Sequence, residues 1–202
     1  NFWSITKSEI AKLKISIITI NLNNKLGLQA TMESVFNQDH SQIEYLVIDA
    51  ASTDGSKALI QANEAKLSYW VSESDTGRYH GMNKGIEQST GEVLLFLNSG
   101  DWLVSNDAIT KAVKYIQKNP QAIHYGNLEQ QTNGKKWIHV YPEDLRLTYL
   151  IDNSIGHPAT FIPRQHFEKI GLYNVNNQVV SDWEFFLRCF IKQISFIHMP
   201  ET

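Results

Sequence analysis

Three groups of polar side chains follow apolar runs in the first half of the chain, and each could contact a ligand. These groups are Asn21–Asn24, Asp49–Asp54 and Asn98–Asp101. Proteins hold Mg²⁺ with one or two carboxylates, completed by phosphate oxygens and water. Asp101 could supply such a carboxylate, and the glycine before it would allow close approach of the backbone. The competing interpretation is a tight turn, because Asn, Ser, Gly and Asp all favour turns.

Other charged side chains in this half also have a chemical and a structural interpretation. Asp49 could accept hydrogen bonds from a base N–H or a ribose hydroxyl, or it could be a strand-end acid facing water. Asp54 precedes a glycine and a helical stretch, so we interpret it first as a turn former or helix cap. Arg78 and Lys84 could face a phosphate or a base, although lone cations on helices are usually solvated.

Near the C-terminus, Asp182 stands in the first turn of a predicted helix. Ser181 and Glu184 are three residues apart and form a capping-box pattern. The helix dipole favours an acid there, and the same position suits a general base that removes a proton from a hydroxyl. His157 is a second-rank candidate, since a single histidine more often satisfies a local hydrogen bond. The other histidines have no metal-ligand spacing, including His80, His124, His139, His166 and His198.

Alternating strand-like and helix-like stretches must position these groups. The strand-like runs are Lys14–Ile20, Ile43–Ile48, Leu67–Val71 and Glu92–Leu97, and helix-like stretches lie between them around residues 28–36, 58–66 and 82–88. Strands and helices that alternate with short links indicate parallel βαβ units and a sheet covered on both faces. Ligands of such sheets bind outside the carboxyl ends of the strands. The three polar groups should therefore share one edge of the sheet and converge on one ligand.

The second half of the sequence is less regular. We expect a helix over residues 106–118 with Ser105 as its N-cap, strands at 123–126, 136–140 and 159–162, a turn at 132–134, and a helix from Ser181.

Composition limits the class of protein. The chain has 202 residues, of which 42% are hydrophobic and 19% charged, so a single soluble globular domain is expected. The net charge of -3 argues against a general nucleic-acid binder. The single cysteine excludes an internal disulfide and a cysteine-based zinc site, which fits a reducing compartment. No apolar run approaches the roughly 18 residues that cross a bilayer. The chain starts at Asn1 and stops after an apolar run, so we expect natural sequence to be missing at its ends.

Five segments in order carry a resemblance to a known family. They read ISIITINLNN at 15–24, YLVIDAASTDGS at 45–56, YHGMNKG at 79–85, GEVLLFLNSGD at 91–101 and SDWEFFLR at 181–188. Over about residues 14–190 the chain resembles the inverting family 2 glycosyltransferases, and specifically the branch whose acidic metal motif reads Asn-Ser-Gly-Asp or Asn-Ser-Asp-Asp. Those enzymes mostly build bacterial surface polysaccharides and lipid-linked oligosaccharides. The resemblance implies an α/β GT-A fold with an open, mostly parallel central sheet and helices on both faces.

The resemblance also implies roles for individual residues. Thr19 and Asn21 would lie beside the base and ribose, Asp49 would bind the base, and Arg78 and Asn83 would border the nucleotide. Asn98 would lie near the donor, and Asp101 would bind Mg²⁺ or Mn²⁺. His157 would lie near the acceptor or the diphosphate, and Asp182 would be the catalytic base. Within one domain of residues 1–202, residues 14–104 would bind the nucleotide sugar, which the resemblance implies to be a UDP-sugar. Residues 105–202 would bind the acceptor. The acceptor would be a saccharide or a lipid-linked molecule. The enzyme would work in the cytoplasm at the inner face of the membrane, with peripheral membrane contact. No nucleic-acid partner is expected.

Some positions depart from the family pattern. The metal motif has a single carboxylate, because Asn98 and Gly100 replace the acids of a fuller Asp-x-Asp. Ala50 and Ala51 stand where acidic or glycine residues are common, which would alter the base pocket. The segment Arg78–His80 replaces a more frequent Ile-Tyr-Asp, so the donor sugar would differ from the commonest ones.

Two other functions fit part of the pattern. A sugar-1-phosphate nucleotidylyltransferase has a related core and an acidic metal site, but it needs a glycine-rich basic loop, and Asn21–Asn24 contains neither glycine nor arginine. A non-catalytic nucleotide-sugar-binding module would not need both Asp101 and Asp182. Replacing Asp182 with Asn separates the three, because binding survives and turnover disappears only in a transferase.

Overall fold

The computed structural model describes residues 12–200 of the chain, so the predicted domain of residues 1–202 is seen without its two ends. The strands are β1 Ile15–Asn21, β2 Ile43–Asp49, β3 Tyr69–Ser72, β4 Val93–Phe96, β5 Ile123–Gly126, β6 Leu128–Thr132, β7 Lys135–His139, β8 Thr160–Pro163 and β9 Phe196–Met199. The helices are α2 Lys25–Phe36, α3 Ser56–Ala62, α4 Arg78–Gln88, α5 Ala108–Ile116, α6 Leu147–Asp152, α7 Gln165–Ile170 and α8 Ser181–Ile191, with short 3-10 turns η1 Glu64–Lys66 and η2 His157–Ala159.

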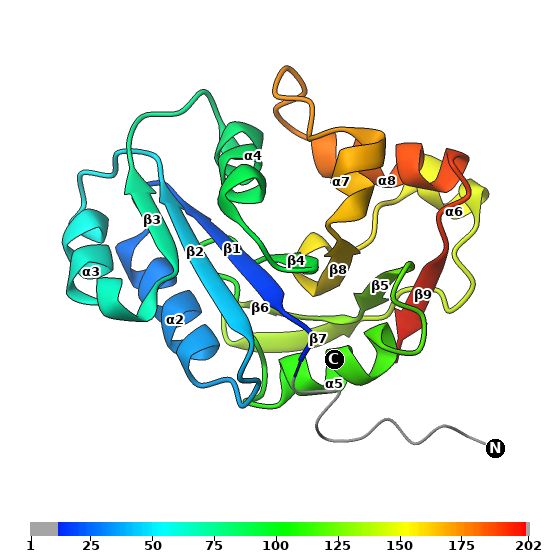
Figure 1. Ribbon diagram of the computed structural model, residues 1–202, viewed down its shortest axis with the longest axis horizontal. Coiled ribbons are helices and arrows are strands. Elements are labelled where there is room, and N and C mark those ends of the chain that lie inside the picture. The colour runs from blue at the N-terminus through cyan, green and yellow to red at the C-terminus, as the bar shows by residue number, and fades with distance from the viewer. Residues whose placement is uncertain (1–11, 201–202) are drawn as a thin grey trace.

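A seven-stranded sheet in the order β3-β2-β1-β4-β8-β5-β9 forms the centre of the molecule. β1, β2, β3 and β4 are mutually parallel, as predicted, and β8 is antiparallel to both of its neighbours. β9 then pairs parallel with β5. The sheet is therefore mostly parallel and runs without a break from the first half of the chain into the second (Figure 1).

Helices cover both faces of this sheet, because the strands are apolar on both sides. β1 shows the pattern: Ile15 and Ile17 pack with α2, α3 and α5, whereas Ile18 packs on the other face with α4 and α8. All three isoleucines are fully buried. Figure 1 shows α4, α7 and α8 on one face and α2, α3 and α5 on the other. Gly85 lets α4 lie close to β1, since a Cβ there would stand 2.4 Å from Ile18 Cγ2.

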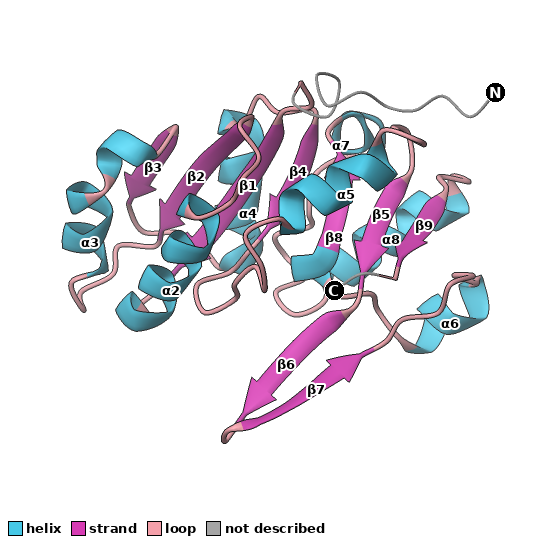
Figure 2. Cartoon of the chain, turned by 90° about the horizontal axis from the view of Figure 1, so that it is seen from below, coloured by secondary structure: helices cyan, strands magenta, loops and turns pink. Residues whose placement is uncertain are grey.

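The second half differs from the sequence prediction in several elements. The turn predicted at residues 132–134 is present, with φ of 52° at Asn133 and 76° at Gly134, but it joins β7 to β6 and not to β5. β6 was missed because its sequence, LEQQT, is polar and half to fully exposed, so it carries no strand-like alternation. The hairpin β6–β7 projects beyond the main sheet, as Figure 2 shows. Short helices α6 and α7 were also not predicted.

Two predicted helix caps are wrong in detail. The N-cap of α5 is Asp107, and the hydroxyl of Ser105 donates to that carboxylate at 2.6 Å. α8 begins with Ser181 itself after an N-cap at Val180, and the Ser181 hydroxyl is buried without a hydrogen-bond partner among the described residues. The capping box therefore does not form, because Ser181 is one residue too far into the helix.

Candidate active site

The carboxyl ends of β1, β2 and β3 are in register and are joined by hydrogen bonds. Asn21 pairs with Asp49, and Asp49 pairs with Ser72. The fully buried Asp49 carboxylate accepts from Asn21 Nδ2 at 2.7 Å and from the Ser72 hydroxyl at 2.6 Å. It also accepts from the backbone N–H and the hydroxyl of Ser52, at 3.0 and 2.5 Å. Asp49 thus organises the strand ends, and its predicted contact with a base would have to compete with these four bonds.

The other polar groups converge on the same edge, as the strand order predicted. Asn24 Nδ2 donates to the carbonyl of Ser99 at 2.8 Å, which joins the first polar group to the third. Asp54 accepts from the backbone N–H of Lys25 at 2.7 Å and from that of Ser56 at 3.0 Å. Its carboxylate therefore binds the first backbone N–H of both α2 and α3, although the N-cap residues of these helices are Asn24 and Gly55. The structural role preferred from the sequence is thus present as a turn contact and not as an N-cap.

The segment 98–101 forms a tight turn that α2 holds in place. Gly100 has φ of 106°, which favours glycine, and the Asp101 N–H donates to the Asn98 carbonyl at 2.9 Å. The buried Thr31 hydroxyl of α2 donates to the Asp101 carbonyl at 2.6 Å and accepts from the Gly100 N–H at 3.0 Å. Asp101 Oδ2 accepts from the Asn98 N–H at 3.1 Å. The turn interpretation is therefore correct, and it leaves Asp101 Oδ1 available to a ligand.

This turn fits a cation that takes one carboxylate from the protein. Burial raises the pKa of Asp101, partly offset by the hydrogen bond from the Asn98 backbone, so a positive charge beside it would be favourable. The side-chain oxygen of Asn98 is buried without a hydrogen-bond partner among the described residues. Within residues 12–200, no group of three or more His, Cys, Asp or Glu side chains is arranged to hold a metal ion. A metal here would need further oxygens from its ligand.

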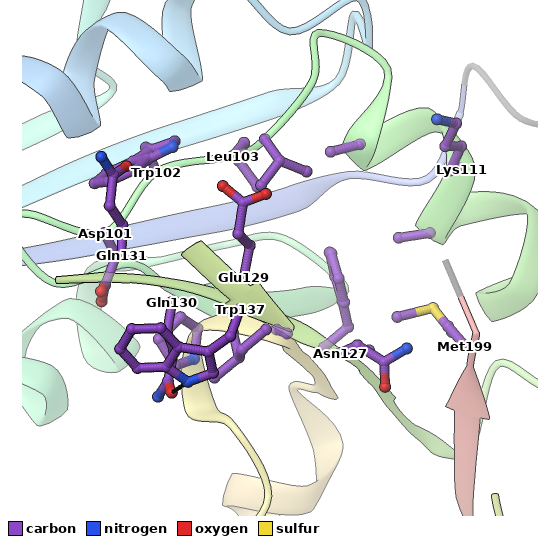
Figure 3. A pocket seen from close by; sticks show the side chains of 18 of the residues that line it. Asp101, Trp102, Leu103, Lys111, Asn127, Glu129, Gln130, Gln131, Trp137 and Met199 are labelled. Atoms are coloured by element: carbon purple, nitrogen blue, oxygen red, sulfur yellow. Dashed lines mark hydrogen bonds between the residues drawn. The ribbon is translucent and has the colours of Figure 1, made fainter. Parts of the chain in front are cut away.

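Asp101 also borders a pocket of about 500 Å³ between the 100–104 loop, α5 and the β6–β7 hairpin. Figure 3 shows the side chains of Asp101, Trp102 and Trp137 around it. The two indoles are 45% and 46% exposed, which is unusual for tryptophan. Trp137 Nε1 donates to Gln130 Oε1 at 2.7 Å, which fixes the ring within the hairpin. The pocket lies on the α5 side of the sheet.

Asp182 stands on the other face of the sheet, at the start of α8. Its side chain is 23% exposed. Oδ1 accepts a hydrogen bond of 2.6 Å from the Tyr79 hydroxyl, and Oδ2 lies 3.7 Å from His157 Nδ1. Burial lowers the pKa of His157 to about 4, against the opposing effect of the Asp182 charge, so the imidazole is neutral at pH 7. Asp182 is thus a partly exposed carboxylate that accepts one hydrogen bond from the uncharged Tyr79 hydroxyl and lies beside the neutral His157 ring.

Asp101 and Asp182 are connected through His157, which packs beside the last residue of β4 and lies next to Asp182. Its ring centroid lies 4.8 Å from that of Phe96, the last residue of β4. The Asn98–Asp101 turn begins two residues later. His157 therefore links the turn that carries Asp101 to the cluster that carries Asp182.

Other residues predicted for the site have structural contacts. Thr19 is fully buried, with its hydroxyl 3.0 Å from that of Tyr45, so its side chain lies within the core. Asn83 is also buried: its Nδ2 donates to the Tyr173 carbonyl at 2.9 Å and its Oδ1 accepts from the Tyr173 N–H at 3.1 Å. Arg78 is exposed at the start of α4. Lys84 is paired with Glu73 at 2.7 Å. The predicted nucleotide contacts of Thr19, Arg78 and Asn83 stay predictions.

Sequence reasoning missed several residues that build the site. Tyr79 lies in a motif that was singled out, but its contact with Asp182 spans 103 positions and leaves no local signal. Tyr173, whose hydroxyl lies 2.8 Å from His157 Nε2, stands in a segment without any motif. Thr31 appeared only as part of a helical stretch. The sequence signal that could have identified Thr31 is a hydroxyl on an otherwise apolar helix face.

No helix among the described residues is long and apolar enough to cross a membrane.

Comparison with known proteins identifies the family. The family model described as glycosyl transferase family 2 matches residues 16–179. An uncharacterized glycosyltransferase of Mycobacterium tuberculosis is 34% identical over 177 residues, covering 86% of this chain and 68% of that protein. A PGL/p-HBAD biosynthesis glycosyltransferase of Mycobacterium bovis is 31% identical over 179 residues, covering 87% of this chain and 69% of that protein.

Solved structures confirm the fold. S. aureus TarS 1-349 in complex with UDP matches with a TM-score of 0.75 at 17% identity, over 94% of this chain and 59% of that one. A mannosyltransferase from Pyrobaculum calidifontis, in complex with GDP-Man and Mn²⁺, matches with a TM-score of 0.72 at 16% identity, over 93% of this chain and 55% of that one. The chain therefore spans little more than half the length of these structures. Its α/β architecture is the predicted GT-A fold, and the chain is a glycosyltransferase that belongs to glycosyl transferase family 2.

Proposed function

We propose that this chain is an inverting glycosyltransferase that moves a sugar from a UDP-sugar to a hydroxyl of a saccharide or lipid-linked acceptor at the cytoplasmic face of the membrane. The observation that carries the proposal is the placement of two carboxylates at one end of the sheet. Asp101 Oδ1 has no hydrogen-bond partner among the described residues, and Asp182 is partly exposed beside the Tyr79 hydroxyl and the neutral His157 ring. A nucleotide diphosphate needs a cation and the reacting hydroxyl needs a base, and these positions could serve the two needs.

The proposed chemistry is one displacement at the anomeric carbon. The acceptor hydroxyl loses its proton to Asp182, and its oxygen forms a bond to the anomeric carbon from the face opposite the phosphate. The bond between that carbon and the phosphate oxygen breaks, and UDP leaves with the electron pair. Attack from the opposite face inverts the anomeric configuration.

Asp101 would hold Mg²⁺ or Mn²⁺ together with oxygens of the diphosphate. The cation supplies charge neutralisation for the leaving group. Support comes from the related structures, since one holds UDP and another holds GDP-Man with Mn²⁺. The names of two relatives, one for PGL/p-HBAD biosynthesis in M. bovis and one for putative teichuronic acid biosynthesis in Bacillus subtilis, support an acceptor of a biosynthetic pathway. No observation favours the nucleotidylyltransferase, whose basic glycine-rich loop is missing at residues 21–24.

The test is a comparison of turnover and binding in two variants of α8. UDP release from a panel of UDP-sugars is measured with Mn²⁺ and a mixture of saccharide and polyprenyl-linked acceptors. Asp182→Asn should lower turnover by about 10²- to 10⁴-fold and leave UDP affinity unchanged. Glu184→Gln is the matched control, because Glu184 lies in the same turn but is bound to Asn174 and Asn177. Equal turnover in wild-type and Asp182→Asn protein would contradict the proposed role.

A further inference from the structure

The two oxygens of Asp182 have different surroundings. Oδ1 is 2.6 Å from the Tyr79 hydroxyl, which is a short, charge-assisted hydrogen bond. Oδ2 is 3.7 Å from His157 Nδ1, which is too long for a hydrogen bond. One oxygen is therefore occupied by a donor from the protein, and the other is free to receive a proton.

We infer that Tyr79 is a positioning residue whose hydroxyl holds Oδ1 of Asp182 and leaves Oδ2, which faces Nδ1 of His157, as the proton-accepting oxygen. That Asp182 accepts a proton during transfer rests on the function proposed above. The arrangement of Tyr79, Asp182 and His157 stands on their contacts alone.

Tyr79 is held by packing on several sides. Its side chain is 3% exposed, and its ring centroid lies 5.6 Å from that of Tyr173. The hydroxyl also lies 3.0 Å from the Val179 carbonyl, but its single proton goes to the closer, charged acceptor. Burial raises the pKa of Tyr79, and the hydrogen bond to Asp182 and the charge of Asp182 raise it further. The phenol therefore stays protonated and donates at all physiological pH values.

The tautomer of His157 follows from what its neighbours can do. The imidazole is neutral at pH 7, so it carries one proton. A carboxylate only accepts hydrogen bonds, so the nitrogen that faces Asp182 favours the proton. Nε2 is then unprotonated and accepts from the Tyr173 hydroxyl at 2.8 Å. Asn83 fixes Tyr173 through both backbone groups, which gives this buried asparagine a positioning role.

Charged neighbours do not change this assignment. Arg188 donates to the carbonyls of Ile170 and Leu172, at 2.9 and 3.0 Å, and so belongs to the segment before Tyr173. The titratable or charged groups around Asp182 are Arg78 and Tyr79 on α4, His157 on η2, Tyr173 after α7, and Glu184 and Arg188 on α8. Among these, Tyr79 alone has a described hydrogen bond to the Asp182 carboxylate.

The experiment uses Tyr79→Phe, with Tyr125→Phe as the matched control. Tyr125 is a buried tyrosine of the same core that donates to the Pro142 carbonyl at 2.6 Å. The Asp182 carboxyl carbon is followed by ¹³C NMR against pH, with its resonance assigned by its loss in Asp182→Asn. In Tyr79→Phe it should titrate about one pH unit higher than in wild-type protein, since a donor to the ionised form is lost. The control should not move it, and the acid limb of turnover should shift with it.

A second measurement does not depend on the variant. Nitrogen-15 NMR of histidine-labelled wild-type protein distinguishes the two tautomers, and we expect His157 to carry its proton on Nδ1. An Nε2-protonated His157, or an Asp182 titration unchanged in folded Tyr79→Phe, would overturn the inference. These outcomes are separate from failure of the proposed function. If Asp182→Asn retained full turnover while both NMR results held, the arrangement would be right and the assigned base wrong.

Discussion

At the scale of single residues, the neutral His157 has a consequence for stability. Its pKa is about 4 in the folded protein, because burial outweighs the charge of Asp182, and about 6.5 in an unfolded chain. Between these values the unfolded chain binds the proton and the folded protein does not. Stability contributed by a neutral His157 is therefore present above pH 6.5 and falls as pH drops from 6.5 to 4.

We predict that this residue alone contributes a slope of up to about 1.4 kcal/mol per pH unit in that window. Urea unfolding of wild-type protein and His157→Gln at several pH values checks this. Between pH 6.5 and 4, the free energy of unfolding should fall further in the wild-type protein than in His157→Gln. This comparison does not depend on the difference in unfolding free energy between the two proteins at pH 7. Parallel curves for the two proteins would show that His157 is not held neutral by burial.

The candidate residues were predicted unevenly, for a physical reason. Asp101, Asp182 and His157 stand in short motifs or beside them, and their positions at strand and helix ends follow from local patterns. The contacts that define their chemistry join distant parts of the chain. Tyr79 reaches Asp182 across 103 positions, and these contacts exist only after the sheet has formed. A list of motifs therefore names the candidate reacting groups but not the groups that orient them.

At the scale of elements, α2 is the support of the turn that carries Asp101. Thr31 uses one hydroxyl to join α2 to the carbonyl of Asp101 and the N–H of Gly100. The hydroxyl also lies 3.0 Å from the Gly27 carbonyl within the helix. A valine has the same shape and removes these bonds without removing the carboxylate, so it separates the position of the turn from its charge.

We predict that Thr31→Val lowers metal-dependent UDP affinity several-fold and destabilises the protein by about 1–3 kcal/mol, because buried backbone groups lose their partner. Thr110→Val is the control, since Thr110 donates at 2.6 Å to Asp39 at an exposed site on α5. Titration calorimetry and urea unfolding measure the two effects. Unchanged UDP affinity in folded Thr31→Val would mean that α2 does not position the turn.

Elements were predictable where apolar periodicity was strong. β1 and β2 are apolar and buried on both faces, so their sequences indicated parallel strands directly. β6 is polar and largely exposed and was missed, whereas the exposed β7 lies where a strand was predicted at 136–140. The pairing of β6 with β7 depends on the turn at Asn133 and Gly134. Sequence periodicity reports burial, and it is weak where little is buried.

At the scale of the whole molecule, one sheet joins the two predicted halves of the chain. β4 of the first half pairs with β8 of the second, through Val93 with Pro163 and Leu94 with Ile162. One buried core also includes Leu46 from the first half with Tyr125 and Phe186 from the second. We therefore expect the predicted donor-binding and acceptor-binding halves to fold as one unit.

We predict that both halves unfold together. Trp70 in β3 and Trp183 in α8 report on the two halves when the protein is labelled with fluorotryptophan. Their ¹⁹F signals should disappear with the same urea midpoint, as expected for a cooperative unit. Two separate midpoints would show that residues 14–104 and 105–200 are independently stable.

In the proposed function, Asp101 joins a nucleotide diphosphate to the protein through a divalent cation. The most direct measurement is calorimetric titration of UDP into wild-type protein, Asp101→Asn and the control Asp144→Asn, with and without Mn²⁺. Asp144 is a suitable control because its side chain is 75% exposed and paired only with the equally exposed Arg146 among the residues described. We expect Mn²⁺-dependent UDP binding in wild-type and Asp144→Asn protein, and its loss in Asp101→Asn. UDP binding that is independent of Mn²⁺, or that survives in Asp101→Asn, would contradict the account.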